Sequence, residues 1–267
     1  MHVSIEYIFA GITVFLILGV TSQYATNIVH NSASLIEKEG AAERADKIID
    51  MLLLSPGSPQ GWGEQLDEPR TMGLAVENAI KLYKLDASKV KRLSSNATNY
   101  IPPYRVRDLL GLSTYTYISL KIYPLFNISI TKITEESFSV KVLNQWNAPV
   151  SNINITAAYS DITDLTKEDI SSFMDNTLEN ASYTSNNTDL LGTSTLSFPG
   201  IGTQPTLIVL ASALDVKSLA IWPQGNSPLV GVLEASMGTS SAYSTDIVSR
   251  SVDIDGLNYI ARLAVWG

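Results

Sequence analysis

The sequence predicts an α+β protein in three parts: a long N-terminal helix over 1–54, a short helical connector over 55–122 and an antiparallel β-sandwich over 123–267. Two observations predict this arrangement. No proline occurs before Pro56, and an apolar run followed by a one-sided apolar stripe precedes it, as a continuous helix requires. From Tyr123 onward, apolar residues alternate with polar ones, which is the period of a β-strand.

The N-terminal apolar segment, residues 5–25, is long enough as a helix to cross a bilayer core of roughly 30 Å. A stripe of apolar residues spaced seven apart continues the helix beyond it, and the Pro and Gly residues after Leu54 end it. The stripe consists of Ile28, Leu35, Ala42 and Ile49. No Lys or Arg precedes the segment and no small-residue cleavage site follows it, so a retained helix is favoured over a secretory signal peptide.

The connector is expected to be compact and mostly helical. Apolar residues between Met72 and Leu85 fit one face of a helix, Asp86 fits the N-cap of another, and a short helix is expected after Pro103. Trp62, flanked by glycines, is predicted to close a loop over a core, with a ligand platform as the alternative.

The third part shows the strand and turn rhythm of an immunoglobulin-like or related sandwich of roughly seven to nine strands. Residues 207–210 are apolar on both faces and predict a central strand. The dipeptide Asp255-Gly256 predicts a β-hairpin before the last strand. Between these strands, residues 160–187 are polar and predict a helical excursion or a long loop.

Composition narrows the function classes. The net charge is −8 and no Lys/Arg cluster is present, so nucleic acid is not an expected partner. The absence of cysteine excludes disulfides and cysteine catalysis. Asn-X-Ser/Thr sequons follow the apolar segment and fit a glycosylated exterior region, although such short motifs also arise by chance. These possible N-glycosylation sites are Asn96, Asn127, Asn154, Asn180 and Asn186.

No catalytic residue, metal site or cofactor is predicted, and the chain is expected not to be an enzyme. The histidines His2 and His30 lie far apart in the sequence and form no cluster. Asp253 and Asp255 could offer oxygens to Ca²⁺, but the spacing of an EF-hand loop is missing. A surface hydrolase would need a pair of acids that meet in a cleft, and it stays the third alternative.

The stretch "HVSIEYIFAG" contains an acid, Glu6, where an apolar segment begins. A carboxylate is costly in hydrocarbon, so its presence asks for a reason. The stretch resembles the start of archaeal type IV pilin-like proteins with class III signal peptides. In that pattern a Glu is the fifth residue of the mature chain, and counted from His2 the fifth residue here is Glu6. His2 stands where the pattern has Gln, and the basic leader ending in Gly is not present.

The resemblance implies a processing site at Met1 and His2 for a prepilin peptidase, and an assembly element at Ile5, Glu6 and Tyr7. It implies that Glu6 pairs with the α-amino group of a neighbouring subunit and so sets register. The alternative is that Glu6 lies among lipid headgroups without a special role. Residues from about Met51 to Leu112 also resemble a segment of archaeal membrane-anchored pilin-like proteins, in which a Trp-containing loop follows the long helix.

These observations predict a non-enzymatic subunit of a cell-surface filament, inserted in the membrane before assembly and then packed against other copies or related subunits. The size of the part after the helix favours a minor or tip subunit over a major one. The alternative is a monomeric membrane-anchored module for binding or adhesion outside the cell.

Overall fold

The computed structural model describes residues 23, 43–95, 97, 99–160, 166–178, 181–199, 206–223, 235–236 and 246–266. The chain divides into two compact units, residues 1–47 and 48–267. In the first unit, the described part ends in helical residues 43–47, where Lys47 Nζ lies 2.6 Å from Glu43 Oε1. In the second unit, residues 48–54 are helical.

The predicted α+β class is wrong for the described residues, which are mostly β. Strands make up 42% of them and helices 17%, and all four helices are short. The predicted long helix over 1–54 lies mainly outside the described residues. Within the described residues, 43–54 are helical. No helix in the described part of the chain has both the length and the apolar character that a membrane crossing requires.

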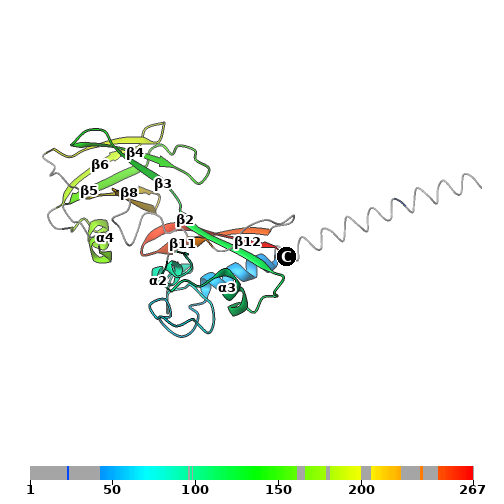
Figure 1. The fold of residues 1–267 in the computed structure, drawn as a ribbon. Helices are drawn as coiled ribbons and strands as arrows, with labels where there is room; N and C mark the ends of the chain where they lie inside the picture. The colour runs from blue at the N-terminus through cyan, green and yellow to red at the C-terminus, as the bar shows by residue number, and fades with distance from the viewer. Residues whose placement is uncertain are drawn as a thin grey trace, which may run out of the picture. The chain divides into compact units, whose positions relative to one another are not determined.

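The described residues of the second unit form three sheets, drawn in Figure 1. A five-stranded sheet has the order β1 (Lys84–Leu85), β11 (Asp246–Ile254), β12 (Leu257–Trp266), β2 (Tyr117–Pro124) and β10 (Ala235–Ser236). A three-stranded sheet has the order β3 (Asn127–Lys132), β4 (Ser137–Leu143) and β7 (Thr193–Ser197). A four-stranded sheet has the order β6 (Ser182–Asn187), β5 (Asn154–Ser160), β8 (Thr206–Ala213) and β9 (Val216–Trp222).

The three-stranded and four-stranded sheets enclose one apolar core and so form a sandwich. Alternate residues of β4, β5, β7 and β8, with residues of β3 and β9, point into it, and Phe138 meets Trp222 of the opposite sheet edge to face at 5.2 Å between ring centroids. The order 3-4-7 facing 6-5-8-9 is the order of an immunoglobulin-type sandwich in which one edge strand has moved to the second sheet. As predicted from its apolar run, β8 is a central strand between β5 and β9.

The sandwich has seven strands, within the predicted number, but it does not extend to the end of the chain as predicted, because β11 and β12 do not join it. They form a hairpin that pairs with β2 in the five-stranded sheet. The predicted hairpin turn at Asp255-Gly256 is confirmed: both residues have positive φ, 52° and 82°, which gives a two-residue turn whose twist matches the strands. The hairpin pattern is local, whereas the choice of sheet depends on pairing with a strand more than a hundred residues earlier.

The predicted helical face between Met72 and Leu85 is also wrong. This segment is extended or irregular, with isolated bridges such as Ala75 to Leu85, and β1 pairs in parallel with β11. Met72, Leu74 and Leu85 are buried, but Ile80 and Leu82 are exposed, as an irregular chain allows and a helix face would not. The short helices α2 (Ala87–Lys91) and α3 (Pro103–Leu109) begin where the sequence predicted, at the Asp86 cap and at Pro103.

The polar stretch after β5 contains α4 (Lys167–Met174), which is the predicted helical excursion. A capping box begins it: Thr166 Oγ1 accepts from the Asp169 backbone N–H at 3.2 Å, and Asp169 Oδ2 accepts from the Thr166 N–H at 2.8 Å. Ile170 and Phe173 are buried, and the Phe173 ring stacks on Tyr183 of β6. The helix therefore lies against the four-stranded sheet.

Candidate functional site

The predicted assembly and processing residues, Met1, His2, Ile5, Glu6 and Tyr7, lie outside the described residues. Their roles stay predictions. The candidate sites that the structure does describe are three of the sequons, the acidic turn of the last hairpin and the surroundings of Trp62.

Among the sequons, Asn127, Asn154 and Asn186 are exposed, at the first residue of β3, the first residue of β5 and inside β6. Asn96 and Asn180 lie outside the described residues. Asn186 is engaged by its neighbours, because its Nδ2 donates to the Thr195 carbonyl at 3.2 Å. Asn127 and Asn154 therefore offer the more open acceptor positions.

The acidic turn does not gather ligands for a cation. Asp253 Oδ2 accepts from Lys81 Nζ at 3.0 Å, and Asp253 Oδ1 accepts from the Gly256 N–H at 3.1 Å. Both oxygens are thus used within the protein. No group of three or more potential metal-ligating side chains occurs among the described residues. Nearby, burial and the charge of Asp255 raise the pKa of Tyr259 to about 12.

Trp62 is fully buried, as predicted for a loop that closes over a core. Its indole Nε1–H donates to two backbone carbonyls, Pro56 O at 3.1 Å and Gly73 O at 3.2 Å. Gly57, which lies beside the ring, is needed for space. A Cβ on Gly57, whose φ is +71°, would stand 2.8 Å from Nε1 and 2.7 Å from the Thr71 carbonyl. The glycine-rich loop therefore folds tightly around the indole ring.

Two cations that the sequence analysis did not single out accompany the ring, and neither side chain is exposed to solvent. Lys89 Nζ lies 6.0 Å and Arg92 Cζ 5.4 Å from the ring of Trp62, within range of a cation–π interaction. Both belong to the segment that begins at the Asp86 cap, so the turn of α2 directs them to the same side. In the sequence, the spacing of three residues between Lys89 and Arg92 is the signal that could have indicated that both lie on one side of a helix.

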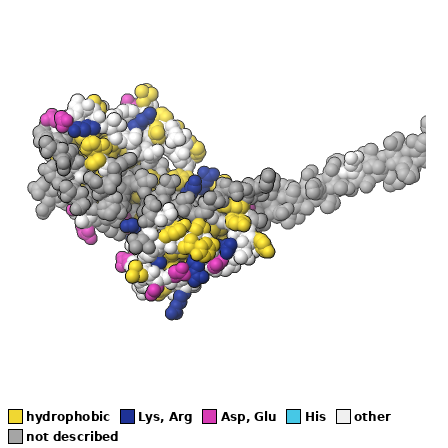
Figure 2. Space-filling view, in the orientation of Figure 1, with side chains coloured by type: hydrophobic (Ala, Val, Ile, Leu, Met, Phe, Trp, Pro, Cys, Tyr) yellow, Lys and Arg dark blue, Asp and Glu magenta, His cyan; other side chains and the backbone are white. Residues whose placement is uncertain are grey.

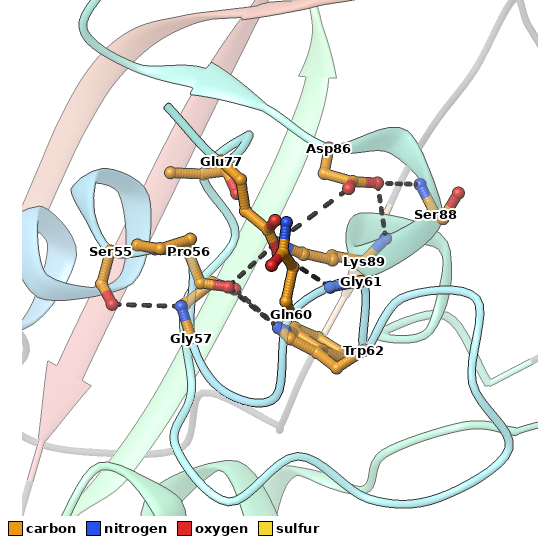
Figure 3. Close-up of polar contacts among 12 residues, drawn as sticks. Ser55, Pro56, Gly57, Gln60, Gly61, Trp62, Glu77, Asp86, Ser88 and Lys89 are labelled. Atoms are coloured by element: carbon orange, nitrogen blue, oxygen red, sulfur yellow. Dashed lines mark hydrogen bonds and ion pairs between the residues drawn. The ribbon is translucent and has the colours of Figure 1, made fainter. Parts of the chain in front are cut away.

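The Lys89 ammonium is bound on several sides, as Figure 3 shows. It donates to Pro56 O at 2.9 Å and to Ala75 O at 3.0 Å. The carboxylates of Glu77 and Asp86 each lie 4.0 Å away. Glu77 Oε1 also accepts from the Gly61 N–H at 2.7 Å, so the same carboxylate holds the loop before Trp62.

Arg92 makes a similar set of bonds. Its Nη1 donates to Trp62 O at 2.6 Å and to Asp67 O at 3.0 Å, and its Nε donates to Asn99 O at 3.0 Å. Burial lowers the pKa of the guanidinium, while the charges of Glu68 and Asp67 act in the opposite direction. A guanidinium titrates so far above neutrality that it stays charged.

The cluster of Trp62, Lys89 and Arg92 thus directs its donors to backbone carbonyls. Such bonds satisfy buried polar groups of an irregular loop, which would otherwise cost free energy. This arrangement stabilises the segment after the first helix and offers no open face of the ring to a ligand. No protein-family model, curated protein or solved structure matches this chain.

Proposed function

We propose that this chain is a non-enzymatic subunit of an archaeal type IV pilus-like surface filament, assembled through its apolar N-terminal segment. The observation that carries the proposal is the stretch "HVSIEYIFAG", in which Glu6 follows His2 at the spacing of the pilin-like pattern. In this proposal the chain is a minor or tip subunit. Its β-rich part then faces outward, for adhesion or for contacts with other subunits.

The proposed role of Glu6 is to set the register between subunits. When apolar segments 5–25 of several subunits pack together, a carboxylate among them is strongly penalised unless a positive group pairs with it. The α-amino group of a chain that starts at His2 is a positive group at the matching height. A shifted neighbour would leave both charges unpaired, so the pair selects one register.

The polar outer faces of the described strands support the proposal that the sandwich faces outward from the filament. Ser, Thr and Asn occupy most outward positions of the sandwich strands, as in the β6 sequence SYTSNN and the β7 sequence TSTLS. The buried cations Lys89 and Arg92 bond to backbone carbonyls, which is a structural use. These features fit a subunit that contributes area and contacts.

The test is to express the full chain in its source cells, as wild type and as Glu6→Gln, and to separate sheared filaments from membranes. Wild type is expected in the filament fraction, and Glu6→Gln is expected to stay in the membrane fraction because the registry pair is lost. Glu37→Gln, at a charged position outside the apolar segment 5–25 and off the apolar stripe, serves as the matched control and is expected to behave as wild type.

Intact mass of the wild-type protein adds a second measurement, and a chain that starts at His2 or close to it supports processing. A wild-type chain that stays monomeric in the membrane under every condition contradicts the proposal. That result would favour the alternative, a membrane-anchored module for binding or adhesion.

A further inference from the structure

Three turns of the sandwich carry large apolar side chains that are exposed to solvent. Trp146 in the β4–β5 connection is 76% exposed, and Leu190 and Leu191 between β6 and β7 are 87% and 70% exposed. Leu214 in the β8–β9 turn is 99% exposed. Single exposed apolar residues are ordinary, but a group of this size in one region calls for an explanation.

The strand registers place all three turns at one end of the sandwich. Asn154 at the start of β5 pairs with Asn187 at the end of β6 and with Ser212 near the end of β8. Lys141 near the end of β4 pairs with Thr193 at the start of β7. The connections 144–153, 188–192 and 214–215 therefore leave the sheets on the same side, which we call the apolar end.

Side-chain caps hold two of these turns in shape. Asn144 Oδ1 accepts from the N–H groups of Trp146 at 2.9 Å and Ala148 at 3.0 Å. Asp189 Oδ1 accepts from the N–H groups of Leu191 at 2.9 Å and Thr193 at 2.8 Å. Polar residues at the tips would satisfy these turns equally well. The apolar tips are therefore presented by a rigid framework and contribute little to its stability.

The third turn has a local cost. Leu214 and Asp215 have φ values of 48° and 65°, which favour Gly, Asn or Asp over a residue with a larger side chain. Leu at such a position costs roughly 1 kcal/mol, and its fully exposed side chain recovers none of this by packing. Leu214 thus has an unfavourable backbone conformation and a side chain that does not pack within the protein. This combination indicates that the side chain contacts something outside the protein.

The charges behind the tips are basic. Residues 144–152 contain no charged side chain. Lys141 on β4 and Lys217 on β9 lie a few residues behind the tips, one on each sheet, and neither forms an ion pair with another described residue. Two acids lie at the tips themselves, Asp189, whose carboxylate accepts from N–H groups of its own turn, and Asp215. The apolar end thus has exposed apolar side chains at its tips and two lysines, Lys141 and Lys217, a few residues further along the strands.

We propose that the apolar end docks onto a lipid membrane surface, with Trp146, Leu190, Leu191 and Leu214 entering the interface between headgroups and acyl chains. Lysines behind the tips then meet the phosphates of anionic lipids. Trp is favoured at this depth because its ring is apolar and its N–H can still find a partner. Transfer of each Leu side chain from water into the lipid interface stabilises docking by the amount usual for burial of an apolar side chain.

The arrangement of the tips favours lipid over a protein partner. Strands in a sheet lie about 4.8 Å apart, so turns that start from β6 and β8, with β5 between them, are separated by about 10 Å. On the face drawn in Figure 2, hydrophobic side chains of the sandwich stand at separate points and form no single patch. A fluid interface fills the space between separate tips, whereas a protein partner would need a matching pocket for each one.

This inference goes beyond the filament proposal, and the two can fail separately, because filament assembly depends on residues 5–25 and docking on the sandwich. The test uses the full chain in vesicles of phosphatidylcholine with a minor fraction of phosphatidylglycerol. The readout is quenching of tryptophan fluorescence by acyl-brominated phosphatidylcholine, which acts only at short range. Anchoring through the N-terminal segment alone therefore does not produce the signal.

Trp146 is suited to this measurement because the other tryptophans, Trp62, Trp222 and Trp266, are buried or partly buried. The difference between wild type and Trp146→Phe isolates its emission, which brominated lipid is expected to reduce by about half when the ring enters the interface. The triple variant Leu190→Asn, Leu191→Asn, Leu214→Asn is expected to lose this quenching. Ile133→Asn is the control, because Ile133 is exposed at the opposite end of the sandwich, after β3.

A second pair of variants tests the lysines. Lys141→Gln with Lys217→Gln is expected to weaken quenching on vesicles with phosphatidylglycerol and to leave it unchanged on pure phosphatidylcholine. The proposal is overturned if Trp146 is not quenched, or if the triple Leu variant is quenched like wild type. Protection of Trp146 that depends on the protein-to-lipid ratio and not on brominated lipid would assign the apolar end to contacts between copies, which also overturns it.

Discussion

At the scale of single residues, Lys89 shows how a charge can belong to a core. Its aliphatic stem and its ammonium are both shielded from solvent, and the ammonium replaces water with the carbonyls of Pro56 and Ala75. Trp62 and Arg92 are satisfied in the same way, since the side chain of each donates to carbonyls of irregular backbone. Side-chain donors here satisfy backbone carbonyls that are satisfied by strand pairing elsewhere, because this loop has few backbone partners of its own.

Replacing Lys89 with Met is expected to lower the free energy of unfolding by about 2–3 kcal/mol, because two buried carbonyls lose their donor. Urea denaturation followed by circular dichroism measures the change. Lys91→Met is the matched control, since Lys91 lies on the same helix and is exposed, and it is expected to change stability by less than about 0.5 kcal/mol. Equal effects of the two variants would contradict the structural role of Lys89.

Tyr259 links stability to alkaline pH. Its pKa is raised to about 12 in the folded protein, chiefly by burial, whereas an unfolded tyrosine titrates near 10. The folded state therefore holds its proton more tightly. The corresponding stabilisation is complete below pH 10 and is lost as the pH rises from about 10 to about 12.

Wild type is expected to lose up to about 2–3 kcal/mol relative to Tyr259→Phe over that range, as measured by urea denaturation at a series of pH values. The other tyrosines are common to both proteins and cancel in the difference. A constant difference between the two proteins from neutral pH to pH 12 would show that Tyr259 does not titrate in this way.

At the scale of elements, local signals and tertiary pairing play different parts. The caps at Asp86 and Thr166, the Pro103 helix start and the Asp255-Gly256 turn are all local, and each element begins or turns at these positions. The segment between Met72 and Leu85 has helical spacing but is held extended by bonds to other segments, such as Leu74 N–H to Leu52 O at 2.7 Å. Spacing alone does not reveal such partners.

The capping box of α4 gives a direct measurement of one local signal. Thr166→Ala is expected to destabilise the protein by about 1 kcal/mol, because the Asp169 N–H loses its acceptor and the first turn of α4 frays. Amide hydrogen exchange in residues 167–174 should accelerate by about fivefold or more. Ser171→Ala, at an exposed position of the same helix, is the control and should leave exchange unchanged.

At the scale of the whole second unit, Asp50 joins segments that are distant in the chain. Its Oδ1 accepts from Tyr83 Oη at 3.1 Å and from Arg250 Nε at 3.1 Å. The first helix, the strand-like segment before α2 and β11 therefore meet at one carboxylate. Lys217 N–H to Asn258 Oδ1 at 2.8 Å similarly joins β9 of the sandwich to β12 of the five-stranded sheet.

Asp50→Ala is expected to lower the free energy of unfolding by about 1–2 kcal/mol, a value kept modest because both charged groups are partly exposed. A double-mutant cycle with Tyr83→Phe should show a coupling of about 0.5–1 kcal/mol. The pair of Lys47 and Glu43, in which both side chains are exposed, serves as the comparison and should couple more weakly. Additive effects of Asp50→Ala and Tyr83→Phe would contradict the role of Asp50 as a shared acceptor.

The sequence by itself determined the local features of this protein: the strand period after Tyr123, the caps and the hairpin turn. These depend on residues close together in the chain, whose preferences act before any tertiary contact forms. The tertiary structure alone decided that β11 and β12 join β2 and leave the sandwich to seven other strands. It also decided that Lys89 lies buried and that the exposed residues Trp146, Leu190 and Leu214 share one end. Strand pairing and side-chain burial depend on partners far away in the sequence, and a local pattern contains no information about which distant partner is chosen.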